Sequence, residues 1–128
     1  MFEVDEITGD ITLRQGDSGK YIISGLPTDQ YYTVYLGIQN KNREPIGDEI
    51  SEAASLRSSV ELNFPATLTD LLTVKKNEDT AEYYFGVKLC TAAGREDTLI
   101  IGNKSVGDLN TITVYPKTVE GTLNGSGQ

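Results

Sequence analysis

The sequence predicts an all-β fold, an antiparallel immunoglobulin-like or jelly-roll-like sandwich of seven or eight strands. Apolar and polar residues alternate with period two in most apolar segments, as expected for strands with one buried face. These segments recur about every ten residues with turn residues between them, which is the pattern of antiparallel sandwiches. The chain lacks the regularly placed helices that parallel strands need as crossover connections.

Each expected strand is marked by this alternation. The eight segments are residues 11–13, 21–23, 31–39, 46–54, 58–64, 82–90, 97–101 and 111–115. The segment at 46–54 alternates weakly, so we expect an edge strand or an irregular excursion there. Three leucines at helical spacing follow Pro65, and they predict one short helix near 67–72.

Two of the expected strands begin with a tyrosine pair, Tyr31–Tyr32 and Tyr83–Tyr84. Because neighbouring side chains of a strand point to opposite faces, each pair places one ring in the core and one outside. The residues that this alternation predicts for the core are Ile11, Leu13, Tyr32, Val34, Leu36, Ile38, Val60, Leu62, Phe64, Leu68, Leu72, Phe85, Val87, Leu89, Ile100, Ile112 and Val114.

Outward-facing tyrosines are the candidate contact residues, because tyrosine offers a large contact area at low entropic cost. The predicted protein-interface residues are Tyr31, Tyr35, Tyr84 and Tyr115. Three of these rings share a strand face with a glycine, Tyr31 and Tyr35 with Gly37 in the first strand and Tyr84 with Gly86 in the second. A purely structural alternative is that the rings lie over the glycines and shield the backbone.

The composition excludes several classes of partner. The chain has 128 residues and a net charge of -8, which disfavours binding to nucleic acids or to anionic membranes.

The N-terminal segment of the chain lacks the pattern of a signal peptide, and no stretch approaches the ~20 apolar residues of a transmembrane helix. We therefore expect the protein to mature in a reducing cytoplasm, with its single cysteine, Cys90, as a small core residue.

Residues 16–19 spell Gly-Asp-Ser-Gly, the letters that surround the nucleophilic serine of trypsin-like proteases. A serine nucleophile needs a base, usually histidine, and the chain contains no histidine. We interpret the motif as a tight turn whose glycines adopt positive φ and whose Asp17 or Ser18 bonds back to the backbone. The sequence therefore predicts no catalytic residue, and we do not expect an enzyme.

No metal or cofactor site is predicted either. Zinc sites combine several cysteine and histidine ligands, and Cys90 stands alone. The acidic residues form adjacent pairs such as Asp48–Glu49 and Glu96–Asp97, whose side chains face opposite ways in a strand. The spacing of a calcium-binding EF-hand loop is absent. A calcium ion held by loops that only the fold brings together is left open.

The expected organisation is one sandwich domain over residues 1–120, followed by a short tail. The tail, residues 121–128, is rich in glycine, so it has few side chains that could pack against the domain. We expect this tail to be flexible or to be ordered by a partner.

Four stretches and a final strand together carry a family resemblance. They are residues 10–19, 31–38, 84–89, 94–102 and 112–114. Their order resembles small β-sandwich structural proteins of tailed bacteriophages, such as the N-terminal domain of baseplate upper proteins and related head or tail decoration modules. The resemblance covers about residues 10–120 and consists of turn-and-strand patterns rather than catalytic motifs.

This resemblance implies a non-enzymatic structural protein of a phage virion, made in the host cytoplasm. Its partners would be capsid or tail proteins, or further copies of this chain, with no cofactor, nucleic acid or membrane involved. The chain ends soon after the sandwich, which favours an adaptor or decoration role over host binding. Two alternatives are left open. One is a small acidic inhibitor of a host protein, which would carry a continuous acidic patch. The other is a carbohydrate-binding module, which would need outward aromatic rings beside a groove.

Overall fold

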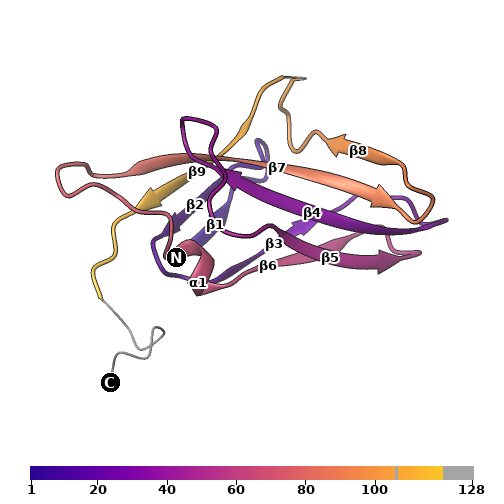
Figure 1. Cartoon of the computed structure of the whole chain (residues 1–128), viewed down its shortest axis with the longest axis horizontal. Coiled ribbons are helices and arrows are strands. Elements are labelled where there is room, and N and C mark those ends of the chain that lie inside the picture. Colours follow the sequence, from indigo (N-terminus) through magenta and orange to yellow (C-terminus); the bar gives the residue numbers. More distant parts are fainter. Residues whose placement is uncertain (106, 120–128) are drawn as a thin grey trace.

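Within the described residues, the chain forms nine strands, more than the seven or eight predicted, and one short helix between the sixth and the seventh strand (Figure 1). The computed structural model describes residues 1–105 and 107–119, so the predicted tail at 121–128 lies outside the described residues. The elements are β1 (Phe2–Val4), β2 (Ile11–Arg14), β3 (Gly19–Ile23), β4 (Tyr31–Gln39), β5 (Ile50–Ser55), β6 (Val60–Phe64), α1 (Ala66–Thr69), β7 (Ala81–Thr91), β8 (Glu96–Leu99) and β9 (Asn110–Tyr115).

Seven of the strands form a large sheet. Its order is β1-β2-β9-β7-β4-β5, and β8 pairs with the C-terminal half of β7. The prediction of an all-β sandwich is confirmed, but one pair of strands departs from the antiparallel pattern. β2 and β9 run parallel, with Ile11 opposite Ile112. Parallel neighbours need a long connection, and here the chain from residue 15 to residue 109 lies between them.

The second layer is the antiparallel pair β3 and β6, which lies over the inward face of the large sheet. Tyr21 of β3 joins the layers, since its ring meets Phe85 of β7 edge-on with 5.4 Å between ring centroids. The large sheet curls, so that its edge strands β1 and β5 come beside β3 and β6. Figure 1 shows β5 and β6 next to each other at the lower side of the molecule.

The core lies between these layers and contains every predicted core residue except Ile100, which is 54% exposed. That prediction was wrong because the register of β8 places Leu99 opposite Val87 on the inward face. The following residue therefore points outward. Four further hydrophobic residues are buried, namely Tyr21, Ile23, Leu26 and Tyr83.

The expected helix near 67–72 is present but shorter, and it begins one residue earlier at Ala66. Pro65 precedes the helix in an extended conformation, which suits a residue whose φ is locked. The fully buried Thr69 donates its hydroxyl to the Asp17 carbonyl at 2.8 Å, which ties the helix to the turn after β2. No helix in the described part of the chain is long and apolar enough to span a membrane.

Candidate functional site

The seven tyrosines divide between the core and the outside. Tyr21, Tyr32 and Tyr83 are buried, and burial raises the pKa of Tyr21 and of Tyr32. Each buried hydroxyl donates to a backbone carbonyl. Tyr21 donates to the Gly9 carbonyl at 2.6 Å, Tyr32 to the Arg57 carbonyl at 2.5 Å and Tyr83 to the Thr73 carbonyl at 2.7 Å. The predicted division of each tyrosine pair into one inward and one outward ring is confirmed.

The four predicted contact tyrosines lie on one surface, the side of the large sheet that faces away from β3 and β6. We call this surface the outward face. Tyr31 and Tyr35 project from β4, and Tyr84 projects from β7 opposite Gln39. Tyr115 lies four residues after Thr111, the partner of Tyr84, so strand alternation puts it on the same face. Three separate strands thus bring the candidate residues together.

These four rings differ in exposure. Tyr31 is 64% exposed and Tyr115 is 39% exposed, whereas Tyr35 and Tyr84 are half-buried. Tyr31 and Tyr35 are four residues apart on one strand, which separates their backbones by about 13 Å. The Arg14 guanidinium stands over the ring of Tyr115 at 5.9 Å from its centroid. The outward face therefore offers spaced aromatic rings rather than a single aromatic cluster.

At the centre of the outward face, Gly37 of β4 lies directly opposite Gly86 of β7. The two glycines leave bare backbone beneath a hollow of about 560 Å³, which Tyr35 and Tyr84 help to line. We call this hollow the glycine groove. The alternative that the tyrosine rings shield the glycines is wrong. A Cβ placed on Gly37 would have Glu49 as its nearest neighbour at 3.5 Å, and one on Gly86 would meet no described atom within 4 Å.

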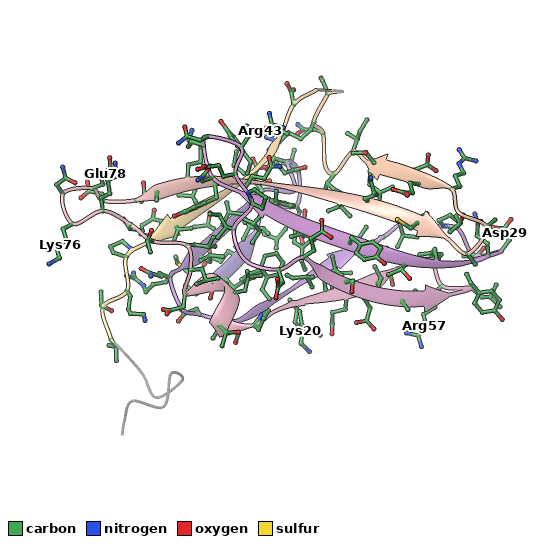
Figure 2. All side chains as sticks on the ribbon, viewed as in Figure 1. Lys20, Asp29, Arg43, Arg57, Lys76 and Glu78 are labelled. Atoms are coloured by element: carbon green, nitrogen blue, oxygen red, sulfur yellow. The ribbon has the colours of Figure 1, made fainter. Side chains whose placement is uncertain are left out.

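One wall of the glycine groove comes from the loop between β4 and β5. Arg43 lies on this loop, which rises above the sheet in Figure 2. Its φ of 68° is in the left-handed region, which is uncommon for a residue with a side chain. The Asn40 side chain holds the turn by accepting hydrogen bonds from the N–H groups of Asn42 and Glu44. The Arg43 Nε in turn donates to Gln39 Oε1 at 2.9 Å, so the guanidinium is directed back toward β4.

The opposite side of the groove is lined by β7 and β8. Lys88 of β7 pairs with Glu96 of β8 at 2.9 Å. This hydrogen bond, with the charge of Glu96 and a smaller contribution from Glu49, raises the pKa of Lys88. Glu49, on the loop before β5, also lines the groove. The groove thus contains two cationic and two anionic side chains, Arg43 and Lys88 against Glu49 and Glu96.

The ring of Tyr84 is held in place from outside the groove. Lys41 places its Nζ 5.3 Å from the ring centroid and bonds Glu82 Oε1 at 2.5 Å. The hydrogen bond to Glu82 is the main reason that the pKa of Lys41 is raised. An ammonium over an aromatic face is an attractive contact, so it restricts the orientation of the ring.

A second hollow of about 540 Å³ lies beside the first on the outward face, lined by residues of β4 and β5 and by Arg57. Tyr35 and Cys90 line both hollows. The prediction that Cys90 is a core residue was wrong, since it is only half-buried and lies on the outward face. It follows Leu89, which is buried, and therefore points to the other side of the sheet.

Residues 16–18 form the turn between β2 and β3, as predicted, whereas Gly19 begins β3 and does not have the predicted positive φ. Gly16 has a φ of 88°, and the backbone N–H of Asp17 donates to the Arg14 carbonyl at 3.0 Å. The Asp17 carboxylate pairs with the N-terminal ammonium group. Neither Asp17 nor Ser18, both among the described residues, bonds through its side chain to the backbone of the turn, so that part of the prediction was wrong. Gly19 has a different role, because a Cβ there would lie 2.0 Å from the ring of Phe2. Both glycines are explained by backbone geometry and packing.

Groups of potential metal ligands are absent from the described residues, since no three His, Cys, Asp or Glu side chains gather there.

The charged residues of the glycine groove were missed by the sequence analysis because they come from a loop and two strands. One sequence signal could have indicated the groove. Each long strand carries a tyrosine two residues before a glycine, Tyr35 before Gly37 and Tyr84 before Gly86.

No protein-family model matches this chain, and no curated protein matches it. Among solved structures, the crystal structure of the periplasmic chaperone SfaE is similar, with a TM-score of 0.60 at 10% sequence identity. The match covers 90% of this chain and 57% of the chaperone chain, so this chain corresponds to little more than half of that protein. The likeness supports the immunoglobulin-like sandwich as the fold and extends to the fold alone.

Proposed function

We propose that this chain is a non-enzymatic structural protein of a tailed-phage virion, an adaptor or decoration module that binds neighbouring capsid or tail proteins. The observation that carries the binding role is the gathering of Tyr31, Tyr35, Tyr84 and Tyr115 on the outward face. Tyrosine is enriched in the centres of protein interfaces. The virion setting is supported by the resemblance of the sequence to phage sandwich proteins.

The distribution of charge also favours an adaptor over an acidic inhibitor. An inhibitor that mimics a polyanion would present its carboxylates as one continuous surface. Among the described residues, seven acidic side chains pair with cationic groups, and these seven are spread over several strands and turns. These pairs offset part of the negative charge locally, which argues against one continuous array of unpaired carboxylates.

The presence of the protein in virions is the first test. Particles are purified by density gradient from a lysate of the host that carries this gene, and their proteins are identified by mass spectrometry. We expect peptides of this chain at a fixed ratio to the major capsid protein. Absence of the chain from particles that contain the other structural proteins would contradict the proposal.

The outward face is tested by a double variant, Tyr31→Ser with Tyr35→Ser. We expect it to lower incorporation into particles while leaving the melting temperature nearly unchanged, because Tyr31 is exposed and Tyr35 is half-buried. Ile22→Ser is the matched control, since Ile22 is 63% exposed but projects from β3 on the other layer. Equal incorporation of both variants would argue against the outward face as the contact surface.

A further inference from the structure

We propose that the glycine groove binds a neutral oligosaccharide. This binding activity is separate from the adaptor role and would add a ligand site to the same outward face. Its basis is the combination of an open floor at Gly86, two aromatic rings on either side of the glycine pair and balanced polar groups.

The floor of the groove has room for a flat, ring-shaped ligand. Gly37 and Gly86 are paired at the centre of the sheet. The space above Gly86 is open, whereas the Glu49 side chain lies next to the space above Gly37, 3.5 Å from the position of a Cβ there. The volume of about 560 Å³ is within the usual range for small-molecule sites, about 300–1,000 Å³. A few linked sugar rings could lie across this floor.

The aromatic walls supply apolar contact of the kind that sugar rings use. Tyr35 and Tyr84 are placed on either side of the glycine pair along the two central strands. A pyranose ring has an apolar C–H face that packs on an aromatic ring, while the tyrosine hydroxyl can bond to a sugar hydroxyl. The Lys41 contact orients Tyr84 before any ligand arrives, which lowers the entropic cost of binding.

The polar groups of the groove match a ligand rich in hydroxyls. Arg43 offers donors, Glu49 offers acceptors and Gln39 offers both. Arg43 and Glu49 also have planar ends that can bond two neighbouring hydroxyls at once. A sugar hydroxyl both donates and accepts, so such a mixed set of partners suits it better than a set of donors alone.

The charge of the groove favours a neutral ligand. Arg43 and Lys88 are balanced by Glu49 and Glu96, although the whole chain carries a net charge of -8. Lys88 is engaged by Glu96, which weakens its attraction for an anion. A polyanion would be repelled by the chain as a whole, and a polycation would find no excess of acid in the groove.

The test uses the purified full chain and defined pentasaccharides in isothermal titration calorimetry, with NMR of the protein as a second measurement. The neutral probes are maltopentaose, cellopentaose and chitopentaose, and a heparin pentasaccharide is the anionic comparison. We expect saturable binding of at least one neutral probe with a Kd of about 1 mM or tighter. Binding of the anionic probe alone, or of no probe, would overturn the proposal.

Two variants assign the binding to the groove. Gly86→Val places a branched side chain on the floor, where a Cβ meets no described atom within 4 Å, so the fold should be retained. Arg43→Gly removes the guanidinium at a position whose positive φ suits glycine. Each variant is expected to weaken binding by about tenfold or more.

The control is Thr113→Val on β9, which is on the outward face but outside the groove. We expect it to bind like the unmodified chain. Folded Gly86→Val and Arg43→Gly proteins that both keep full affinity would show that the sugar binds elsewhere, and this outcome would also overturn the proposal. Incorporation into virions does not enter this test, so it can fail or succeed independently of the adaptor role.

Discussion

Asp10 accepts a hydrogen bond from the backbone N–H of Thr111 at 2.9 Å. This bond lies where β2 and β9 begin to run side by side as the parallel pair of the large sheet. The same carboxylate accepts from the Asn110 side chain at 3.2 Å and pairs with Lys104 at 3.0 Å. Asp10 therefore joins two segments that are about a hundred residues apart, and it supports the register on which the outward face depends.

Replacing Asp10 should destabilise the fold. Asp10→Ala removes all three contacts and leaves the half-buried N–H of Thr111 without its acceptor. We expect a loss of about 1–3 kcal/mol in the free energy of unfolding, measured by urea denaturation. Asp29→Ala is the control, because Asp29 is an exposed loop residue. A variant at position 10 that is as stable as the control would refute this role for Asp10.

The stability should also depend on the protonation of Asp10. Burial alone would raise its pKa, but hydrogen bonds from Thr111, Lys104 and Asn110 outweigh burial and hold the pKa below its usual value of 3.8. A carboxyl group with a lowered pKa stabilises the fold above its unfolded pKa, and this contribution is lost as the pH falls through the folded pKa. We expect Asp10→Asn to flatten the decline in unfolding free energy below about pH 4, measured in a urea series. An unchanged slope would count against the prediction.

An added side chain should have opposite effects on stability at two strand glycines, Gly86 in the large sheet and Gly19 in the β3–β6 pair. Gly86→Val should raise the unfolding free energy by about 0.5–1 kcal/mol, because valine suits a strand and meets no described atom within 4 Å of its Cβ. Gly19→Val should lower it by about 1–3 kcal/mol or more, because its Cβ would overlap the ring of Phe2. Thermal denaturation followed by circular dichroism measures both. The same sign for both variants would contradict this packing.

The buried tyrosine hydroxyls should contribute to stability, in contrast to the exposed one on Tyr31. Tyr83→Phe removes the donor to the Thr73 carbonyl and should cost about 1 kcal/mol. Tyr31→Phe should leave the melting temperature unchanged, because Tyr31 is 64% exposed. Equal melting temperatures for the two variants would mean that water replaces the lost partner of Thr73.

Cys90 should be chemically accessible in the folded protein. It is the single cysteine of the chain and lines both hollows of the outward face. We expect its thiol to react with a disulfide reagent such as dithionitrobenzoate without denaturant, to one equivalent per chain. Reaction only after unfolding would show that the side chain is covered. Cys90→Ser should change the stability by less than about 0.5 kcal/mol, as is usual at surface positions.

Much of the strand pattern could be predicted from local sequence, because the direction of a side chain in a strand depends only on its position along that strand. For this reason the division of Tyr31 from Tyr32 and of Tyr83 from Tyr84 agrees with the structure. Ile100 shows where local reasoning fails. Alternation divides the side chains of a strand between two faces but does not say which face is buried. The pairing of Leu99 with the buried Val87 puts Leu99 on the buried face and Ile100 on the other.

The candidate site was predicted only in part. Its tyrosines could be named because they occupy the outward positions of recognisable strands. The charged residues around them could not, since Arg43, Glu49 and Glu96 belong to segments whose neighbours are set by the curl of the sheet and by loop geometry. Such neighbours depend on contacts between distant parts of the chain.

By itself, the sequence determined the all-β class, the short helix and the alternation that sends one ring of each tyrosine pair outward. These features follow from propensity and periodicity within a few residues. Only the tertiary structure decided that β2 pairs in parallel with β9 and that Gly37 stands opposite Gly86. Strand order and register are chosen by the burial of the whole apolar surface at once, so no single segment contains that information.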